Sequence, residues 1–106
     1  MSGLTLLREV LFATLVASLT GAASAAMLGE PSGTGPLPAT AESVPDLPGH
    51  TLYRPVRWPR APMPLFVWGN GACRDNGLAY AAFLREIASH GYFVVSVGRP
   101  RAERGL

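Results

Sequence analysis

The chain has 106 residues, of which 48% are hydrophobic and 15% are charged, and its formal net charge is +2 at pH 7. This length holds at most one domain, and the apolar content excludes a disordered chain. The small net charge and scattered arginines lack the basic stripe of a nucleic-acid-binding protein, so no nucleic-acid partner is expected. One cysteine, Cys73, can form neither an internal disulfide nor a structural zinc site.

Residues 1–25 have the pattern of an export signal. Arg8 precedes an apolar run from Val10 to Leu19, and Ala23-Ser24-Ala25 supplies the small residues that signal peptidase reads. The strongly apolar part covers about ten residues, whereas a membrane-spanning helix needs roughly 20. We therefore predict a signal-peptide helix cleaved after Ala25, a secreted or periplasmic location, and membrane contact only through the export signal. An uncleaved anchor is the alternative.

Residues 26–49 are rich in proline and glycine and have no apolar periodicity. Such a composition predicts an irregular linker, because it cannot bury enough surface to offset its ordering entropy. After the turn signal at residues 47–49, the alternation of Leu52, Arg54 and Val56 predicts a short strand. Pro55 lacks a backbone N–H and places this strand at the edge of a sheet or near its own end.

Residues 64–98 predict a strand, a glycine loop, a helix and a second strand. Leu65–Trp68 and residues 92–97 are short, almost wholly apolar runs, as expected of parallel strands buried on both faces. Between them, helical periodicity extends from about Leu78 to His90, and Gly91 is a suitable C-terminal cap. The apolar stripe comprises Tyr80, Leu84, Ile87 and Gly91 with Phe83 beside it, and Arg85, Glu86 and Ser89 are expected to point elsewhere. The unit indicates an α/β fold.

The segments Trp-Gly-Asn-Gly-Ala-Cys, Ser-His-Gly and Tyr-Phe-Val-Val-Ser in this order resemble the N-terminal part of the α/β-hydrolase superfamily. The likeness covers about residues 50–98 and is greatest to exported esterase-like members, including dienelactone-hydrolase, lipase and chlorophyllase relatives. It implies a partial hydrolase sheet made of a short edge strand, a strand, a crossover helix and a parallel strand. The expected order of the three strands is the one near Leu52, then residues 92–97, then Leu65–Trp68, which leaves one edge of Leu65–Trp68 for a nucleophile strand.

In this family the loop after the third strand, often His-Gly-x-Gly, supplies a backbone N–H to the oxyanion hole. The resemblance therefore implies that the N–H groups of Asn70, Gly71 and Ala72 are the catalytic donors, with Asn70 first. Trp68 stands where the family usually has histidine. Glycine suits such a loop because it takes positive φ without steric cost and leaves no side chain before the oxyanion. The structural alternative is that these glycines only turn the chain from strand to helix.

The G-x-S-x-G elbow that carries the family's nucleophile does not occur in the sequence, and Ser96 lies within an apolar strand. We therefore expect residues 50–106 to be the N-terminal fragment of a hydrolase domain. The parent would hydrolyse a small-molecule carboxylic ester through a serine acyl-enzyme, with its serine, acid and histidine beyond this chain. The fragment is expected to be inactive alone, and neither a metal nor a cofactor is expected.

Two other functions fit parts of the sequence. The chain could be a small exported protein that binds or interacts without catalysis. It could also be a dinucleotide-binding fragment, since Gly69-x-Gly71 follows a strand and Arg99 follows the next one, where a 2′-phosphate could be met, although Arg74 replaces the third glycine.

Two further groups of side chains have a chemical and a structural interpretation. Cys73 could be an activated nucleophile, which only His50 could approach, or a buried or half-buried thiol. Glu86 and His90, four residues apart, could be an acid–base couple but are more typical of a surface pair.

Overall fold

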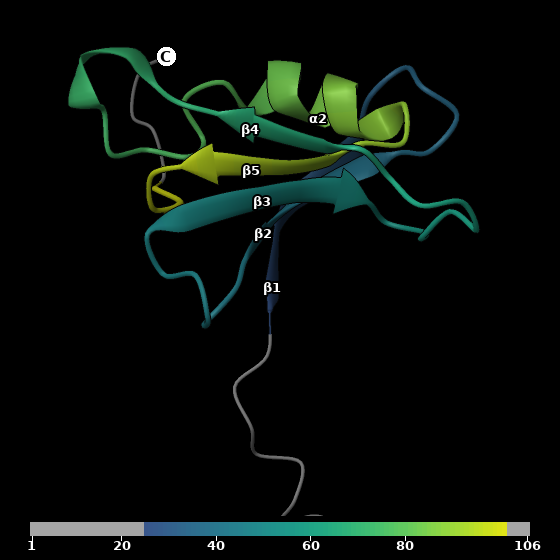
Figure 1. Ribbon diagram of the computed structural model, residues 1–106, viewed down its shortest axis with the longest axis horizontal. Helices are drawn as coiled ribbons and strands as arrows, with labels where there is room; N and C mark the ends of the chain where they lie inside the picture. The colour runs from purple at the N-terminus through teal and green to yellow at the C-terminus, as the bar shows by residue number, and fades with distance from the viewer. Residues whose placement is uncertain (1–24, 102–106) are drawn as a thin grey trace, which may run out of the picture.

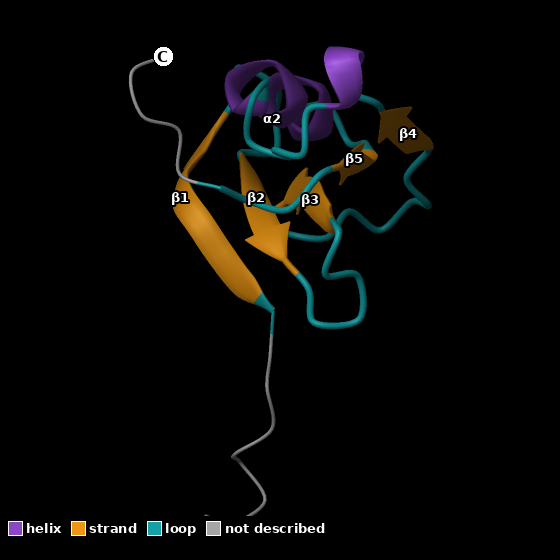
Figure 2. Cartoon of the chain, turned by 90° about the vertical axis from the view of Figure 1, so that its left-hand side faces the viewer, coloured by secondary structure: helices purple, strands orange, loops and turns teal. Residues whose placement is uncertain are grey.

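The computed structural model describes residues 25–101, which form one mixed five-stranded sheet with a single helix packed on one face (Figures 1 and 2). The fold is thus of the α/β kind. The predicted signal peptide, residues 1–25, lies outside the described residues except for Ala25.

The elements in chain order are β1 (Ala26–Ser32), β2 (Ala39–Ser43), β3 (His50–Pro55), β4 (Leu65–Trp68), the short 3₁₀ turn η1 (Gly71–Cys73), α2 (Ala81–Ser89) and β5 (Phe93–Val97). The strand order in the sheet is β1-β2-β3-β5-β4. Strands β1, β2, β3 and β5 pair antiparallel, and β4 pairs parallel to β5. The three C-terminal strands therefore have the order expected from the sequence.

The β4–α2–β5 unit is confirmed, because β4 has the predicted bounds and runs parallel to β5. Helix α2 is shorter than predicted and begins at Ala81. Asn76 explains the delay, since its side chain accepts the Leu78 N–H at 2.9 Å and its carbonyl accepts the Ala79 N–H at 3.3 Å, which holds this stretch in turns. The cap at Gly91 is confirmed by its φ of 95° and by its N–H, which donates to the Ala88 carbonyl.

The prediction of an irregular linker over residues 26–49 is wrong, because this segment contains β1 and β2. Strand β2 contributes Ala39, Thr40 and Ala41 to the interior, and all three are fully buried. Their small side chains allow close packing under the helix but give no bulky apolar signal in the sequence. Pro31 is tolerated because β1 is an edge strand.

The prediction that β3 lies at an edge is also wrong, because β3 is the central strand between β2 and β5. The other half of that prediction, that Pro55 lies near the end of its strand, is correct, since Pro55 is the last residue of β3. Proline at this position removes a donor where the ladder is ending anyway.

The core lies between the sheet and α2, where Ala39, Ala41, Tyr53 and Val94 meet Leu84 and Ala88. Ser89 was expected to point away from the core, and this is wrong because it is fully buried. Its hydroxyl donates to the Glu86 carbonyl at 2.7 Å and accepts the Gly35 N–H at 3.0 Å. A small polar residue at this point lets the β1–β2 loop cross directly against the helix.

The face of β4 turned away from α2 carries Leu65 and Val67, which are 64% and 65% exposed. Within residues 25–101, β4 pairs on one side only, with β5. The sheet therefore has an unpaired apolar edge at β4.

We expect Gly35→Ala to destabilise the protein by about 1–3 kcal/mol, because overpacking of a close contact forces the backbone to move. A Cβ at this position would lie 2.3 Å from the Ser89 carbonyl oxygen. Gly49→Ala is the matched control, since a Cβ there meets nothing within 4 Å. Urea unfolding followed by tryptophan fluorescence compares the two variants. Equal midpoints would show that the loop does not rest on the helix as described.

Candidate functional site

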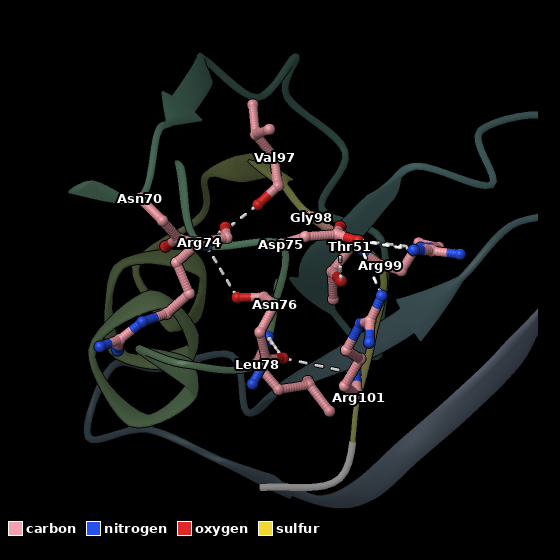
Figure 3. Close-up of polar contacts among 10 residues, drawn as sticks. All are labelled: Thr51, Asn70, Arg74, Asp75, Asn76, Leu78, Val97, Gly98, Arg99 and Arg101. Carbon is pink, nitrogen blue, oxygen red and sulfur yellow. Dashed lines mark hydrogen bonds and ion pairs between the residues drawn. The ribbon is translucent and has the colours of Figure 1, made fainter. Parts of the chain in front are cut away.

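The candidate site is the loop of residues 69–80, which joins β4 to α2 at the carboxyl end of β4 (Figure 3). Residues 98–101 follow the carboxyl end of the parallel strand β5 beside it. The carboxyl ends of parallel strands are where open α/β sheets bind ligands. The predicted donors Asn70, Gly71 and Ala72 are all in this loop.

The side chain of Asn70 fixes the loop. Its Nδ2 donates to the carbonyl oxygens of Asn76 at 2.8 Å, Arg74 at 3.1 Å and Val97 at 3.2 Å. Its Oδ1 accepts the indole N–H of Trp68 at 3.0 Å. Asn70 thereby ties β4, the loop and the end of β5 together. The sequence pattern predicted a role only for its backbone N–H, and this side-chain role was not predicted.

The glycines of the loop do not have the positive φ that we predicted for them. Positive φ values occur instead at Ala72 (57°) and Cys73 (54°), and Asn70 is extended with a φ of −73°. For residues other than glycine, the left-handed region costs roughly 1–2 kcal/mol each. A Cβ at Gly69 or Gly71 would meet nothing within 4 Å. The glycines therefore border open space.

Gly71 and Ala72 are the first residues of η1. Because Ala72 (φ 57°, ψ 33°) and Cys73 (φ 54°) are left-handed, η1 is a single left-handed turn and not the start of a right-handed helix. The hydrogen bonds that hold this loop use other groups, namely the Asn70 side chain and the Gly71 carbonyl, which accepts the Arg74 N–H at 3.3 Å. All of residues 71–75 are exposed.

Two buried side chains of β3 support the loop from beneath. The Tyr53 hydroxyl donates to the Gly77 carbonyl at 2.5 Å, and the Thr51 hydroxyl donates to the Gly98 carbonyl at 3.0 Å. A Cβ on Gly77 would lie only 1.9 Å from the Thr51 hydroxyl, so this position requires glycine. Burial raises the pKa of Tyr53 to about 12, although Arg85 opposes the shift. The hydroxyl therefore remains a donor at neutral pH.

An exposed ionic cluster closes the outer side of the loop. The Asp75 carboxylate accepts three hydrogen bonds from Arg99, one from its backbone N–H at 3.0 Å and two from its guanidinium group at 2.7 and 3.1 Å. It also accepts a guanidinium N–H of Arg101 at 2.8 Å. The backbone hydrogen bond from Arg99 and then its side chain hold the pKa of Asp75 well below its usual range. Sequence reasoning missed this cluster, although Asp75 and Arg99 each follow a parallel strand and such ends meet at one edge.

The ionic cluster contains Arg99, the arginine on which the dinucleotide-binding alternative depends. Arg99, which was to meet a 2′-phosphate, is held by Asp75 in a two-point ion pair. Helix α2 begins only at Ala81, so its N-terminus does not follow the Gly69-x-Gly71 turn directly.

The other two side-chain groups are both exposed, and Cys73 is part of this loop. Cys73 is exposed, so the expectation of a buried or half-buried thiol is wrong. His90 lies 3.1 Å from Glu86 in an exposed pair, as the structural interpretation predicts. Glu86 is also held by the Thr34 N–H at 2.8 Å and by the Thr34 hydroxyl, and these bonds, followed by His90, lower its pKa.

Residues 25–101 contain no group of three or more histidine, cysteine or acidic side chains able to hold a metal ion. None of the helices within that range is long and apolar enough to cross a membrane.

No family model, curated protein or solved structure matches this chain.

We expect Asp75→Asn to lower the thermal midpoint at pH 7 and to have less effect in acid. A carboxylate whose pKa is depressed by folding adds stability above its unfolded pKa, near 3.9, and loses it as the pH falls toward the folded pKa. The difference between wild type and Asp75→Asn should therefore shrink as the pH is lowered from about 5. Calorimetry across this range measures it.

Asp46→Asn is the control for this experiment, because Asp46 is exposed in the β2–β3 turn and has no ion pair among the described residues. Salt of about 1 M should also reduce the effect of Asp75→Asn by screening. A difference that is constant with pH would contradict an electrostatic role for the cluster.

Proposed function

We propose that this chain carries the oxyanion-hole loop of an exported serine-type hydrolase that acts on carboxylic esters. The observation that carries the proposal is the loop itself. It has the N–H groups of Gly71 and Ala72 in an exposed left-handed turn, beside the carboxyl ends of two parallel strands. An oxyanion hole needs donors of this kind facing a space free of side chains, and a Cβ at Gly71 meets nothing within 4 Å.

The sheet supports the same proposal. The order β3-β5-β4 and the parallel pairing of β4 with β5 support the partial hydrolase sheet implied by the resemblance, although β3 is a central strand and not an edge strand. The unpaired side of β4 is where the nucleophile strand of that family would add. Trp68 occupies the family's histidine position and still presents an N–H, which orients Asn70.

Two serines and one histidine of the described residues are engaged in other contacts. Ser89 and Ser96 are fully buried, and their hydroxyls donate to neighbouring carbonyls. His90 is paired with Glu86 on the surface. In the proposal, the serine, acid and histidine of the parent enzyme come from outside this chain. The substrate is a small-molecule ester, the location is secreted or periplasmic through the signal peptide, and this chain alone does not turn over.

A non-catalytic exported binding protein is the second candidate. It is favoured by a cavity of about 550 Å³ at the opposite end of the sheet, which is described below. The two candidates differ in the role of the glycine loop. The next two experiments test the hydrolase candidate.

The first experiment determines the nucleotide sequence downstream of codon 106 and tests the purified chain on a chromogenic short-chain ester. We expect a G-x-S-x-G elbow between a predicted strand and helix within roughly 150 codons, in or near the same frame. We expect no turnover by the chain alone. Absence of the elbow would refute the hydrolase proposal, and turnover blocked by a serine-directed inhibitor would refute the claim that the chain is inert.

The second experiment removes one donor from the longer gene product by Gly71→Pro. Asn70, at φ −73° and ψ 142°, already has the extended conformation required before proline, and Gly71 is not among the residues with positive φ. Loss of this N–H should lower kcat by about 10²–10³-fold. Gly71→Ala keeps the N–H and should retain activity. Equal rates for the two variants, with unchanged thermal midpoints, would exclude Gly71 as a donor.

A further inference from the structure

A cavity of about 550 Å³ lies between the β1–β2 loop and the chain that follows β3. Its walls are mainly apolar and include Leu37, Val56 and Trp58 together with four prolines. These two connections are at the right-hand end of Figure 1, and the glycine loop is at the left-hand end. The cavity is therefore separate from the candidate site described above. Its volume is within the range of small-molecule sites.

The walls of this cavity are fixed before any ligand arrives. The Val56 N–H donates to the Pro38 carbonyl at 3.0 Å and joins the two connections to each other. The Leu37 N–H donates to the Ser89 carbonyl at 3.0 Å and joins one of them to helix α2. Proline fixes φ in the rest of the wall. A preorganised site loses little conformational entropy on binding.

Trp58 is held in place although 62% of it is exposed. Its ring stacks on Phe93 with centroids 6.0 Å apart and planes 24° apart, and the Arg54 guanidinium lies 5.1 Å from its centroid. Arg54 is in turn fixed by Glu42, at 2.9 and 3.2 Å. An exposed, immobilised indole offers a flat apolar surface that water covers poorly.

The charge at the cavity is positive. Arg57 and Arg60 contribute to its lining, and both are exposed. No acidic partner is found for either among residues 25–101. Unpaired guanidinium groups beside an apolar surface fit a ligand that carries a carboxylate on an apolar body, since the planar fork of arginine matches a carboxylate.

We propose that this cavity binds a small organic anion, a carboxylate on a flat apolar body, with the apolar part against Trp58 and the carboxylate toward Arg57 and Arg60. This site does not depend on the hydrolase proposal, since it uses none of the residues of the glycine loop. It assigns the chain a binding function of its own.

The test is a titration of the ¹⁵N-labelled chain with 2-naphthoate, followed by the two tryptophan indole N–H signals. We expect the Trp58 signal to shift and saturate. The Trp68 signal should stay in place, because its N–H is bonded to Asn70 at the other end of the sheet. Arg57→Gln and Arg60→Gln should each weaken binding by about two- to five-fold, as loss of one exposed charge pair does.

Two controls make the result specific. Arg74→Gln removes the same charge from the exposed glycine loop and should leave the affinity unchanged. The neutral isostere 2-naphthamide should bind more weakly than 2-naphthoate. An unmoved Trp58 signal, equal affinity for the amide, or equal effects of Arg74→Gln and the two cavity variants would each overturn the proposal. The same spectra show whether every variant is folded.

Discussion

The hydrogen bond from the buried Tyr53 hydroxyl to the Gly77 carbonyl joins the middle of the sheet to the loop that carries the candidate site. Tyr53 lies on the central strand and is fully buried under α2, so its position is set by the core and not by the surface. An unpaired buried carbonyl would be costly, and the tyrosine removes that cost. The loop can therefore hold two residues in left-handed conformations while remaining exposed to solvent.

The N-terminal strands depend on a different constraint, which is the close approach of the β1–β2 loop to helix α2. Gly33 and Gly35 let the β1–β2 loop lie against Ser89, and Arg85 reaches the Leu28 carbonyl at 2.6 Å from the same helix. Helix α2 thus holds two parts of the sheet in place, with Leu84 and Ala88 on β2, β3 and β5 and with Arg85 and Ser89 on β1 and the β1–β2 loop. One short helix is enough because the strands beneath it carry small residues.

These two constraints explain how far the sequence predicts the fold. The β4–α2–β5 unit was predicted because parallel strands buried in a sheet are apolar runs and the helix has its own period. Strands β1 and β2 were not predicted. Ala39 and Ala41 are buried but too small to give an apolar signal, and the prolines around them are typical of linkers. The central place of β3 was also missed, because one of its two neighbours is β2, which the sequence does not reveal.

The candidate site shows the same division. The position of the loop between β4 and α2 follows from strand and helix patterns, and Asn70, Gly71 and Ala72 lie in it. The groups that shape it were not predicted, because each acts across a long separation in sequence. Asp75 meets Arg99 and Asn70 meets Val97 only after β4 and β5 pair. Backbone angles were misassigned for the opposite reason, since Ala72 and Cys73 adopt conformations that their residue types disfavour.

The strand order also constrains how the molecule assembles. Strand β5 lies between β3 and β4, although both of these precede it in the chain. Until β5 is made, β4 has no neighbour and β3 has one open side. The C-terminal half of the sheet therefore closes only when the whole crossover is present, because both of its neighbouring strands pair with β5. Within residues 25–101, β5 is thus the strand that joins β4 to the rest of the sheet.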